Sequence, residues 1–176
     1  MNLRLAKPTS EEVLRFRKQM ASEAPTYPAD GDFQKFRRSE LVGKSPSAFD
    51  SAREALVNWR MHNMAGVVAE VVPLEPGNDV VLSTRIAGVW LLFACRIVAV
   101  ADLDDRFGFT YVTLPGHPEQ GEESFMAHRY RDEVRLVIEA TSRPSEPLAR
   151  LVSPVTRVLQ KRYTDKYFEA MRTAIN

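Results

Sequence analysis

Hydrophobic residues change their spacing near residue 66, where a helical pattern gives way to an extended one. Before that point, apolar residues recur every three or four positions at Phe49, Ala52, Ala55, Leu56 and Trp59, which predicts a helix with one buried face. Ser45-Pro46 is expected to begin this helix, with serine as the cap and proline in the first turn. After residue 66, β-branched and aromatic residues fill six segments between turn residues. These predict strands over 67–72, 79–86, 90–103, 107–114, 122–130 and 134–142.

Three further elements complete the prediction. Apolar and polar residues alternate irregularly over residues 33–42, which predicts one more strand. At the N-terminus, Thr9 followed by two acids predicts a capped helix that ends by Ala21 and is joined to the rest by a linker containing Pro25 and Pro28. After Pro147 the stripe from Leu148 to Tyr163 predicts a long amphipathic helix, with a kink at Pro154.

The order strand, helix, six strands, long helix predicts an α+β protein with one antiparallel sheet. A sheet with a single apolar face needs a covering layer, and the last helix, expected over about 147–174, has the required length and stripe. This is the order of the helix-grip fold of the birch-pollen-allergen and START-like proteins, in which the sheet wraps around the C-terminal helix and an apolar cavity. We therefore expect a seven-stranded helix-grip domain over residues 31–176, with residues 1–30 as an added helix and linker.

Composition narrows the classes of function. The chain has 176 residues, 44% hydrophobic and 27% charged, with a net charge of +1, so no overall field favours nucleic acid or an anionic membrane. The single cysteine, Cys95, excludes an internal disulfide and is expected in the core. The sequence shows no secretory signal, no membrane span, no cofactor motif and no metal-ligand spacing among its three histidines. We expect a reduced, cytoplasmic protein without metal or cofactor.

Several short motifs resemble uncharacterised protein family 0548, a family of unknown function, across roughly residues 40–172. They are Trp59-Arg60-Met61-His62, Cys95-Arg96-Ile97-Val98, Gly108-Phe109, Thr113-Leu-Pro-Gly-His-Pro118, Gly121-Glu122-Glu123, Ser142-Arg-Pro144, and Arg157 with Gln160. Val112 and Ala94 depart from the pattern, which usually has glycine and proline there. The resemblance implies a domain and a set of family residues but no activity.

The loop from Pro115 to Gln120 is the main candidate for a site. If the strands are consecutive antiparallel neighbours, this loop lies at the same end of the sheet as the turn at Gly88 and the link at Arg143. His117, Glu119 and Glu122 would meet there and are the candidate catalytic residues. The alternative is a tight turn with solvated side chains. Glu122 and Glu123 point to opposite faces of their strand, so at most one of them lines a cavity.

Other residues have two interpretations each. Arg96 and Arg85 either anchor an acidic head group inside the cavity or lie on the outer surface of the sheet. His62 is expected near a helix C-terminus as a structural cation. Together, the candidate ligand-binding residues are Arg85, Trp90, Arg96, Phe109, Tyr111, His117 and Arg143.

Three functions remain open at this stage. The first is binding of a small apolar or amphipathic molecule between the sheet and the last helix. The second is a hydrolase, cyclase or isomerase of the same fold that uses His117 with Glu119 or Glu122. The third is an interaction protein whose basic C-terminal helix meets an acidic partner or RNA. The sequence leaves open whether the protein is an enzyme.

Overall fold

The strands form one antiparallel sheet. The computed structural model describes residues 2–27, 33–145 and 148–175, with side chains in the last range from residue 161 onward. The strands are β1 (Asn2–Arg4), β2 (Gln34–Lys44), β3 (Val67–Ala69), β4 (Asp79–Ile86), β5 (Val89–Leu103), β6 (Arg106–Thr113), β7 (Glu119–Tyr130) and β8 (Glu133–Pro144). Their order in the sheet is β2-β8-β7-β6-β5-β4-β3, and β1 pairs with β5 outside this path.

The seven-stranded antiparallel sheet predicted from the sequence is therefore confirmed, with the short β1 as an addition. Strands β3 to β8 follow one another as antiparallel neighbours, and β2 closes the order by pairing with β8. A bulge between Ile97 and Ala99 shifts the register of β5 against β6, so the side-chain alternation of β5 changes phase there. β6 and β7 approach closely at Gly108, where an added Cβ would lie 2.0 Å from the Phe125 carbonyl oxygen.

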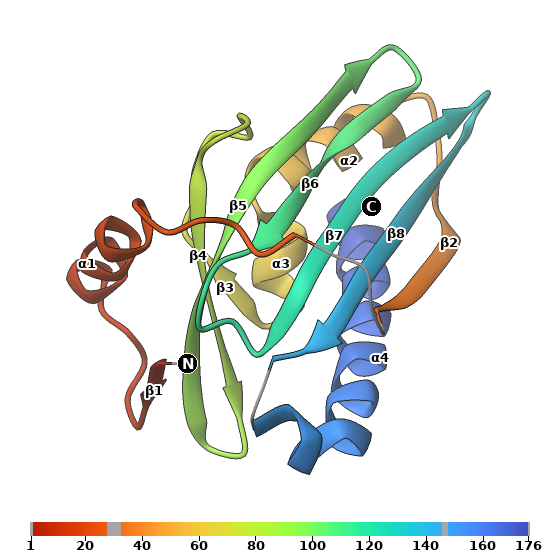
Figure 1. Cartoon of the computed structure of the whole chain (residues 1–176). Coiled ribbons are helices and arrows are strands. Elements are labelled where there is room, and N and C mark those ends of the chain that lie inside the picture. The colour runs from red at the N-terminus through yellow and green to blue at the C-terminus, as the bar shows by residue number, and fades with distance from the viewer. Residues whose placement is uncertain (1, 28–32, 146–147, 176) are drawn as a thin grey trace.

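Three helices cover one face of the sheet, which we call the inner face; the opposite one is the outer face (Figure 1). They are α2 (Ala48–Val57), α3 (Arg60–Met64) and α4 (Leu148–Ile175). The main core lies between these helices and the sheet, where Phe109, Phe125 and Ile138 meet Phe168 and Met171 of α4. The predicted covering role of the last helix is confirmed by these contacts.

Two details of the helices differ from the prediction. The second helix begins at Ala48 after Ser47, whose side chain makes no capping bond, so Ser45-Pro46 precedes it. Trp59 does not continue this helix, because its φ of 55° is left-handed. That conformation ends α2 and starts the short α3 in a new direction. The buried indole N–H of Trp59 donates to the Val72 carbonyl, 3.0 Å away, which stabilises the bend between the two helices.

The N-terminal helix α1 (Ser10–Met20) packs on the outer face beside β4 (Figure 1). Thr9 and Glu12 form a capping box at its start, as the sequence predicted in outline. Met20 packs with Leu92 and Leu114 in a second, smaller core. Further along, the Thr26 amide donates to the Thr113 carbonyl at 2.9 Å, so the segment after α1 crosses the outer face. Pro28, the second proline of the predicted linker, lies outside the described residues.

The long helix α4 runs as one helix across Pro154. The predicted stripe is described from Tyr163 onward, and the side chains of Leu148, Leu151, Val152, Val155, Val158 and Leu159 lie outside the described residues. The same limit applies to Arg150 and Arg157 of the predicted basic surface. Within the described part of that surface, the ammonium of Lys166 lies over the Tyr163 ring at 5.3 Å. The described ranges contain no helix with both the length and the apolar character needed to cross a bilayer.

Candidate functional site

The inner face has a sealed end and a more open end. Towards the turn between β7 and β8, Phe107, Phe125, Ala127 and Leu136 are almost completely buried. Towards the loop 114–118, the inner-face residues Leu91, Phe93 and Glu123 remain partly exposed. Exposure of large apolar side chains on the face that packs against helices is typical of an opening into an interior. This open end is the candidate site.

Tyr111 and Glu123 form the central polar pair of the open end. They face each other on β6 and β7, and the Tyr111 hydroxyl donates to Oε2 of Glu123 at 2.8 Å. Burial raises the pKa of Glu123 to about 7, although the hydrogen bond from Tyr111 lowers it in part. The residue keeps some exposed area, but protein surrounds its carboxyl group densely enough to disfavour the charge. Glu123 is therefore poised to change protonation near neutral pH.

A second carboxyl group lies on the same strand and the same face. Glu119 accepts a hydrogen bond from the Ser142 hydroxyl at 3.0 Å, and burial raises its pKa despite that bond. The charge of Glu119 also contributes to the raised pKa of Glu123. Burial raises the pKa of both groups, so the open end holds two acids that are more easily protonated than free ones.

His62 lies deeper, inside a cluster of aromatic rings. Its ring is completely buried and packs at 4.8 Å from Phe125, 5.0 Å from Trp59 and 5.0 Å from Tyr167. Neither ring nitrogen has a hydrogen-bond partner among the described residues, and burial lowers the pKa of His62 to about 3. The prediction of a cation stabilised at a helix terminus is therefore wrong. Loss of hydration in an apolar cluster keeps this imidazole neutral.

His117 lies at the edge of the open end, in the loop between β6 and β7. Its ring packs edge-on against Phe93 at 4.7 Å. Nδ1 lies 3.0 Å from the Glu119 amide nitrogen and 2.7 Å from the Glu119 carbonyl oxygen. The loop is tied to the end of β8 by the Ser145 amide, which donates to the Pro118 carbonyl at 3.0 Å. The structure brings His117 and the Glu119 backbone together in this loop.

The environment of His117 favours its neutral form. Burial lowers its pKa to about 4, while the Glu119 backbone acts in the opposite direction. An imidazole with that pKa is neutral throughout the physiological range. Glu123 is the group of the open end with a pKa close to 7.

Most of the predicted basic and aromatic ligand residues lie on the outer face or at its edge. Arg96 forms an ion pair with Asp79 at 2.6 Å. It also donates to the backbone carbonyls of Ala21 and Glu23, in the segment that follows α1. It thus holds the N-terminal segment rather than a ligand, as the outer-surface interpretation held. Arg85 is exposed and lies opposite Trp90 in the register of β4 and β5.

Arg143 donates to the Gln120 side chain at 3.0 Å and lies over the Phe33 ring. Alternation along the strands places Arg85, Trp90 and Arg143 on the outer face. Of the predicted ligand residues, Phe109, Tyr111 and His117 are on the inner side. Phe109 is fully buried in the core, whereas Tyr111 donates a hydrogen bond to Glu123 and so belongs to the polar pair.

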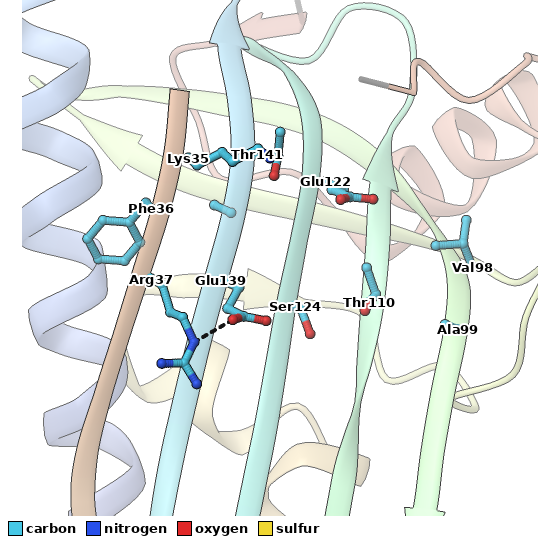
Figure 2. A pocket seen from close by; sticks show the side chains of 11 residues that line it. Lys35, Phe36, Arg37, Val98, Ala99, Thr110, Glu122, Ser124, Glu139 and Thr141 are labelled. Carbon is cyan, nitrogen blue, oxygen red and sulfur yellow. Dashed lines mark hydrogen bonds and ion pairs between the residues drawn. The ribbon is translucent and has the colours of Figure 1, made fainter. Parts of the chain in front are cut away.

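Glu122 belongs to a different surface from the one predicted. It lines an open depression of about 610 Å³ on the outer face, together with Thr110, Ser124 and Val98 (Figure 2). There the Arg37 guanidinium bonds Glu139 at 2.6 Å. Because adjacent strand residues alternate between faces, the inner-face member of the Glu122–Glu123 pair is Glu123.

Sequence reasoning therefore missed Glu123 and the depth of His62. A signal for Glu123 was present, since it shares the parity of Phe125 and Ala127, which are apolar and core-facing. No comparable signal identified His62, because its burial depends on the left-handed turn at Trp59 that starts α3. Among the described residues, no group of three histidine, cysteine or acidic side chains is arranged to hold a metal ion.

Comparison with known proteins identifies the family. The family model described as "Domain of unknown function (DUF1990)" matches residues 17–170. The chain belongs to this family. A UPF0548 protein of Deinococcus radiodurans is 30% identical over 190 residues, covering 93% of each chain. The resemblance to family 0548 inferred from the motifs is thereby confirmed. Membership of the family does not assign an activity to this DUF1990 protein.

Solved structures similar to this DUF1990 protein confirm its fold. A hypothetical protein of Helicobacter pylori aligns with a TM-score of 0.61 at 10% identity, covering 86% of this chain and 92% of its own. The ZhuI aromatase/cyclase of Streptomyces sp. R1128 aligns with a TM-score of 0.57 at 13% identity, covering 81% and 93%. At such identities the likeness concerns the fold alone. The fold is the helix-grip fold, as the element order predicted.

Proposed function

We propose that this protein binds a small apolar or amphipathic molecule between the inner face of the sheet and α4, entering near the loop 114–118. The proposal rests on the partial exposure of Leu91, Phe93 and Glu123 on the inner face, whose other end is buried beneath the helices. Apolar walls with a few fixed polar groups are the usual composition of a small-molecule site. Here the polar groups are the Tyr111–Glu123 pair, Glu119 and the edge residue His117.

Binding of N-phenyl-1-naphthylamine, an uncharged probe whose fluorescence rises in apolar surroundings, tests this proposal. We expect saturable binding by the full chain. The Phe93→Arg variant places a charge in the entrance and should weaken binding by about tenfold or more. Val98→Arg is a matched change at a residue that lines the outer depression, and it should leave binding unchanged. Equal effects of the two changes, with both variants folded by circular dichroism, would contradict an inner-face site.

An enzyme of the same fold is a second candidate, because Glu123 has a pKa near 7 and an accessible position. General acid–base catalysis is most effective when the pKa of the group lies near the working pH. In such an enzyme Glu123 transfers the proton, and Tyr111 orients the Glu123 carboxylate. Glu119 and His117 lie beside the reacting group. Glu122 has no part in it, since it lies on the outer face.

Proton abstraction can be tested without knowledge of the natural substrate. A medium-chain ketone such as 2-decanone in deuterated buffer would exchange its α-protons if Glu123 acts as a base, and NMR measures that exchange. The expected result is exchange with the native chain and its loss in Glu123→Gln, with Glu122→Gln as the matched control. Equal exchange in the native chain and in Glu123→Gln would remove Glu123 from the chemistry.

A further inference from the structure

The N-terminal strand β1 extends the sheet at its open end (Figure 1). One edge of β5 is paired with β4 over residues 89–96. β6 occupies the opposite edge as far as Ala94, whose carbonyl accepts the Leu114 amide at 3.0 Å, and the chain then continues into the loop 114–118. β1 pairs with the next stretch of β5, residues 90–92. Because β4 holds the other edge there, β1 and the loop lie next to each other along the same edge of β5.

Leu3 is the residue of β1 that belongs to the inner face. It lies opposite Leu91 in the antiparallel register of β1 and β5, and directly opposed residues project from the same face of a sheet. Leu91 shares its face with Cys95 and Ile97, which pack in the main core. Leu3 therefore continues the inner face beyond Leu91 and Phe93, and it is 55% exposed.

Contacts with the first helix hold β1 in this position. Arg4 of β1 forms an ion pair with Glu12 of α1, the residue that also completes the capping box of that helix. α1 is in turn fixed to the sheet by Met20, which packs in the smaller core, and by an ion pair between Arg17 and Glu70 at 3.2 Å. A strand of three residues forms few hydrogen bonds of its own, so these contacts with α1 keep it in register.

We propose that Leu3 is a binding residue of the inner-face site, and that the apolar part of the ligand extends out of the interior along Phe93, Leu91 and Leu3. The inference rests on the proposed binding function and adds the N-terminal strand to its site. Phe93 and Leu91 are neighbours on one face of β5, and Leu3 lies beside Leu91, so the three side chains form one continuous apolar row.

This row suits an amphipathic ligand with an extended alkyl chain. All three side chains are exposed or partly exposed, and covering them with an alkyl chain removes apolar surface from water, which is favourable. The family model matches from residue 17 onward, so β1 is a part of the site that lies outside the matched residues.

Backbone amide NMR of the full native chain tests this placement with 1-decanol, an uncharged alkyl probe kept below its solubility limit. We expect the amide resonances of Leu91, Phe93 and Leu3 to shift along one saturation curve. The resonance of Leu14, an exposed leucine of α1, should stay in place. Shifts at Leu91 and Phe93 without a shift at Leu3 would overturn the inference and leave the binding function standing. Absence of a saturable shift at all three would overturn both.

Variants test the contribution of the Leu3 side chain. Leu3→Arg places a charge in the apolar row and should weaken 1-decanol binding by about tenfold, measured by displacement of N-phenyl-1-naphthylamine. Leu3→Ala keeps β1 apolar and should weaken 1-decanol binding by about threefold, because it removes most of the contact. Leu14→Arg, the same change on α1, should keep the native affinity. Equal affinities of Leu3→Arg and Leu14→Arg would overturn the role of Leu3.

Sedimentation velocity tests the other use of an exposed leucine, which is contact with a second copy of the chain. We expect the native chain and Leu3→Arg to sediment alike. A native dimer that dissociates in Leu3→Arg would assign Leu3 to a subunit interface and overturn its role in ligand binding.

Discussion

Tyr111 and Glu123 lie directly opposite each other on β6 and β7, and the Tyr111 hydroxyl donates to the Glu123 carboxylate at 2.8 Å. This cross-strand pair places an ionisable acid on the inner face of the sheet, next to the aromatic core. The same register that packs Phe109 against Phe125 holds the acid in position. The polar site therefore depends on the same packing as the core.

Glu123 should make the protein less stable as the pH rises. Its pKa is about 7 in the folded chain, above the ordinary value of 4.5, so the folded state binds the proton more tightly. The unfolding free energy should then fall between about pH 4.5 and pH 7. We expect this fall in unfolding free energy to be about 1–2 kcal/mol, a value that allows for the partial exposure of Glu123. The Glu123→Gln variant should not show it.

Urea denaturation at pH 5 and pH 8 measures this effect as the difference between native and variant chains. Glu122→Gln on the outer face serves as the control. A variant whose stability changes with pH in parallel with that of the native chain would show that Glu123 has an ordinary pKa.

His62 should weaken the fold in acid. Its pKa is about 3 when folded, against 6.5 for a free imidazole, so the unfolded state binds the proton more tightly. Stability should fall by up to about 1.4 kcal/mol for each pH unit below about 6, until the folded pKa is reached.

His62→Leu, which differs little in volume, should flatten this acid limb without changing the pH dependence above 7. Denaturation curves at pH 4, 5 and 7.5 measure it, with His128→Gln as the comparison because His128 is only partly buried. An acid limb that persists in His62→Leu would assign the effect to other groups.

Arg96 should be a stability residue and not a binding residue. The side chains of Arg96 and Asp79 are 19% and 7% exposed, so Arg96→Met leaves a poorly solvated carboxylate without its partner. A loss of about 3 kcal/mol in unfolding free energy is expected. Affinity for N-phenyl-1-naphthylamine at a temperature where the variant is folded should not change. Arg85→Met, at an exposed arginine of the same face, should cost less than about 0.5 kcal/mol; equal costs would argue against the pairing.

His117 should remain neutral from pH 5.5 to 7.5. Burial lowers its pKa to about 4, so its ring resonances in a heteronuclear NMR titration should move only below about pH 5. His117→Ala should cost about 1–2 kcal/mol, because it removes the ring contact with Phe93 and the acceptor for the Glu119 amide. A ring titration midpoint near 6.5 would mean that the loop is more open to water than the structure shows.

The sequence by itself determined most of the elements and their order, although not β1 or α3. Strand alternation, turn residues and helical stripes depend on neighbouring residues, so β4, β5, β8 and α4 could be predicted closely from local patterns. The loop 114–118 could also be predicted, because its two prolines and its position between strands are local properties. The capping box at Thr9 belongs to the same class.

Only the tertiary structure decided which polar residues share an environment. Whether Arg96 faces the interior depends on the phase of its strand against the helices, and the apolar run around Arg96 leaves that phase open. The burial of His62 depends on the left-handed turn at Trp59 and on rings from β6, β7 and α4, which are distant in sequence. The pKa values of Glu123 and His117 follow from the same long-range packing, because desolvation is set by all surrounding atoms and not by sequence neighbours.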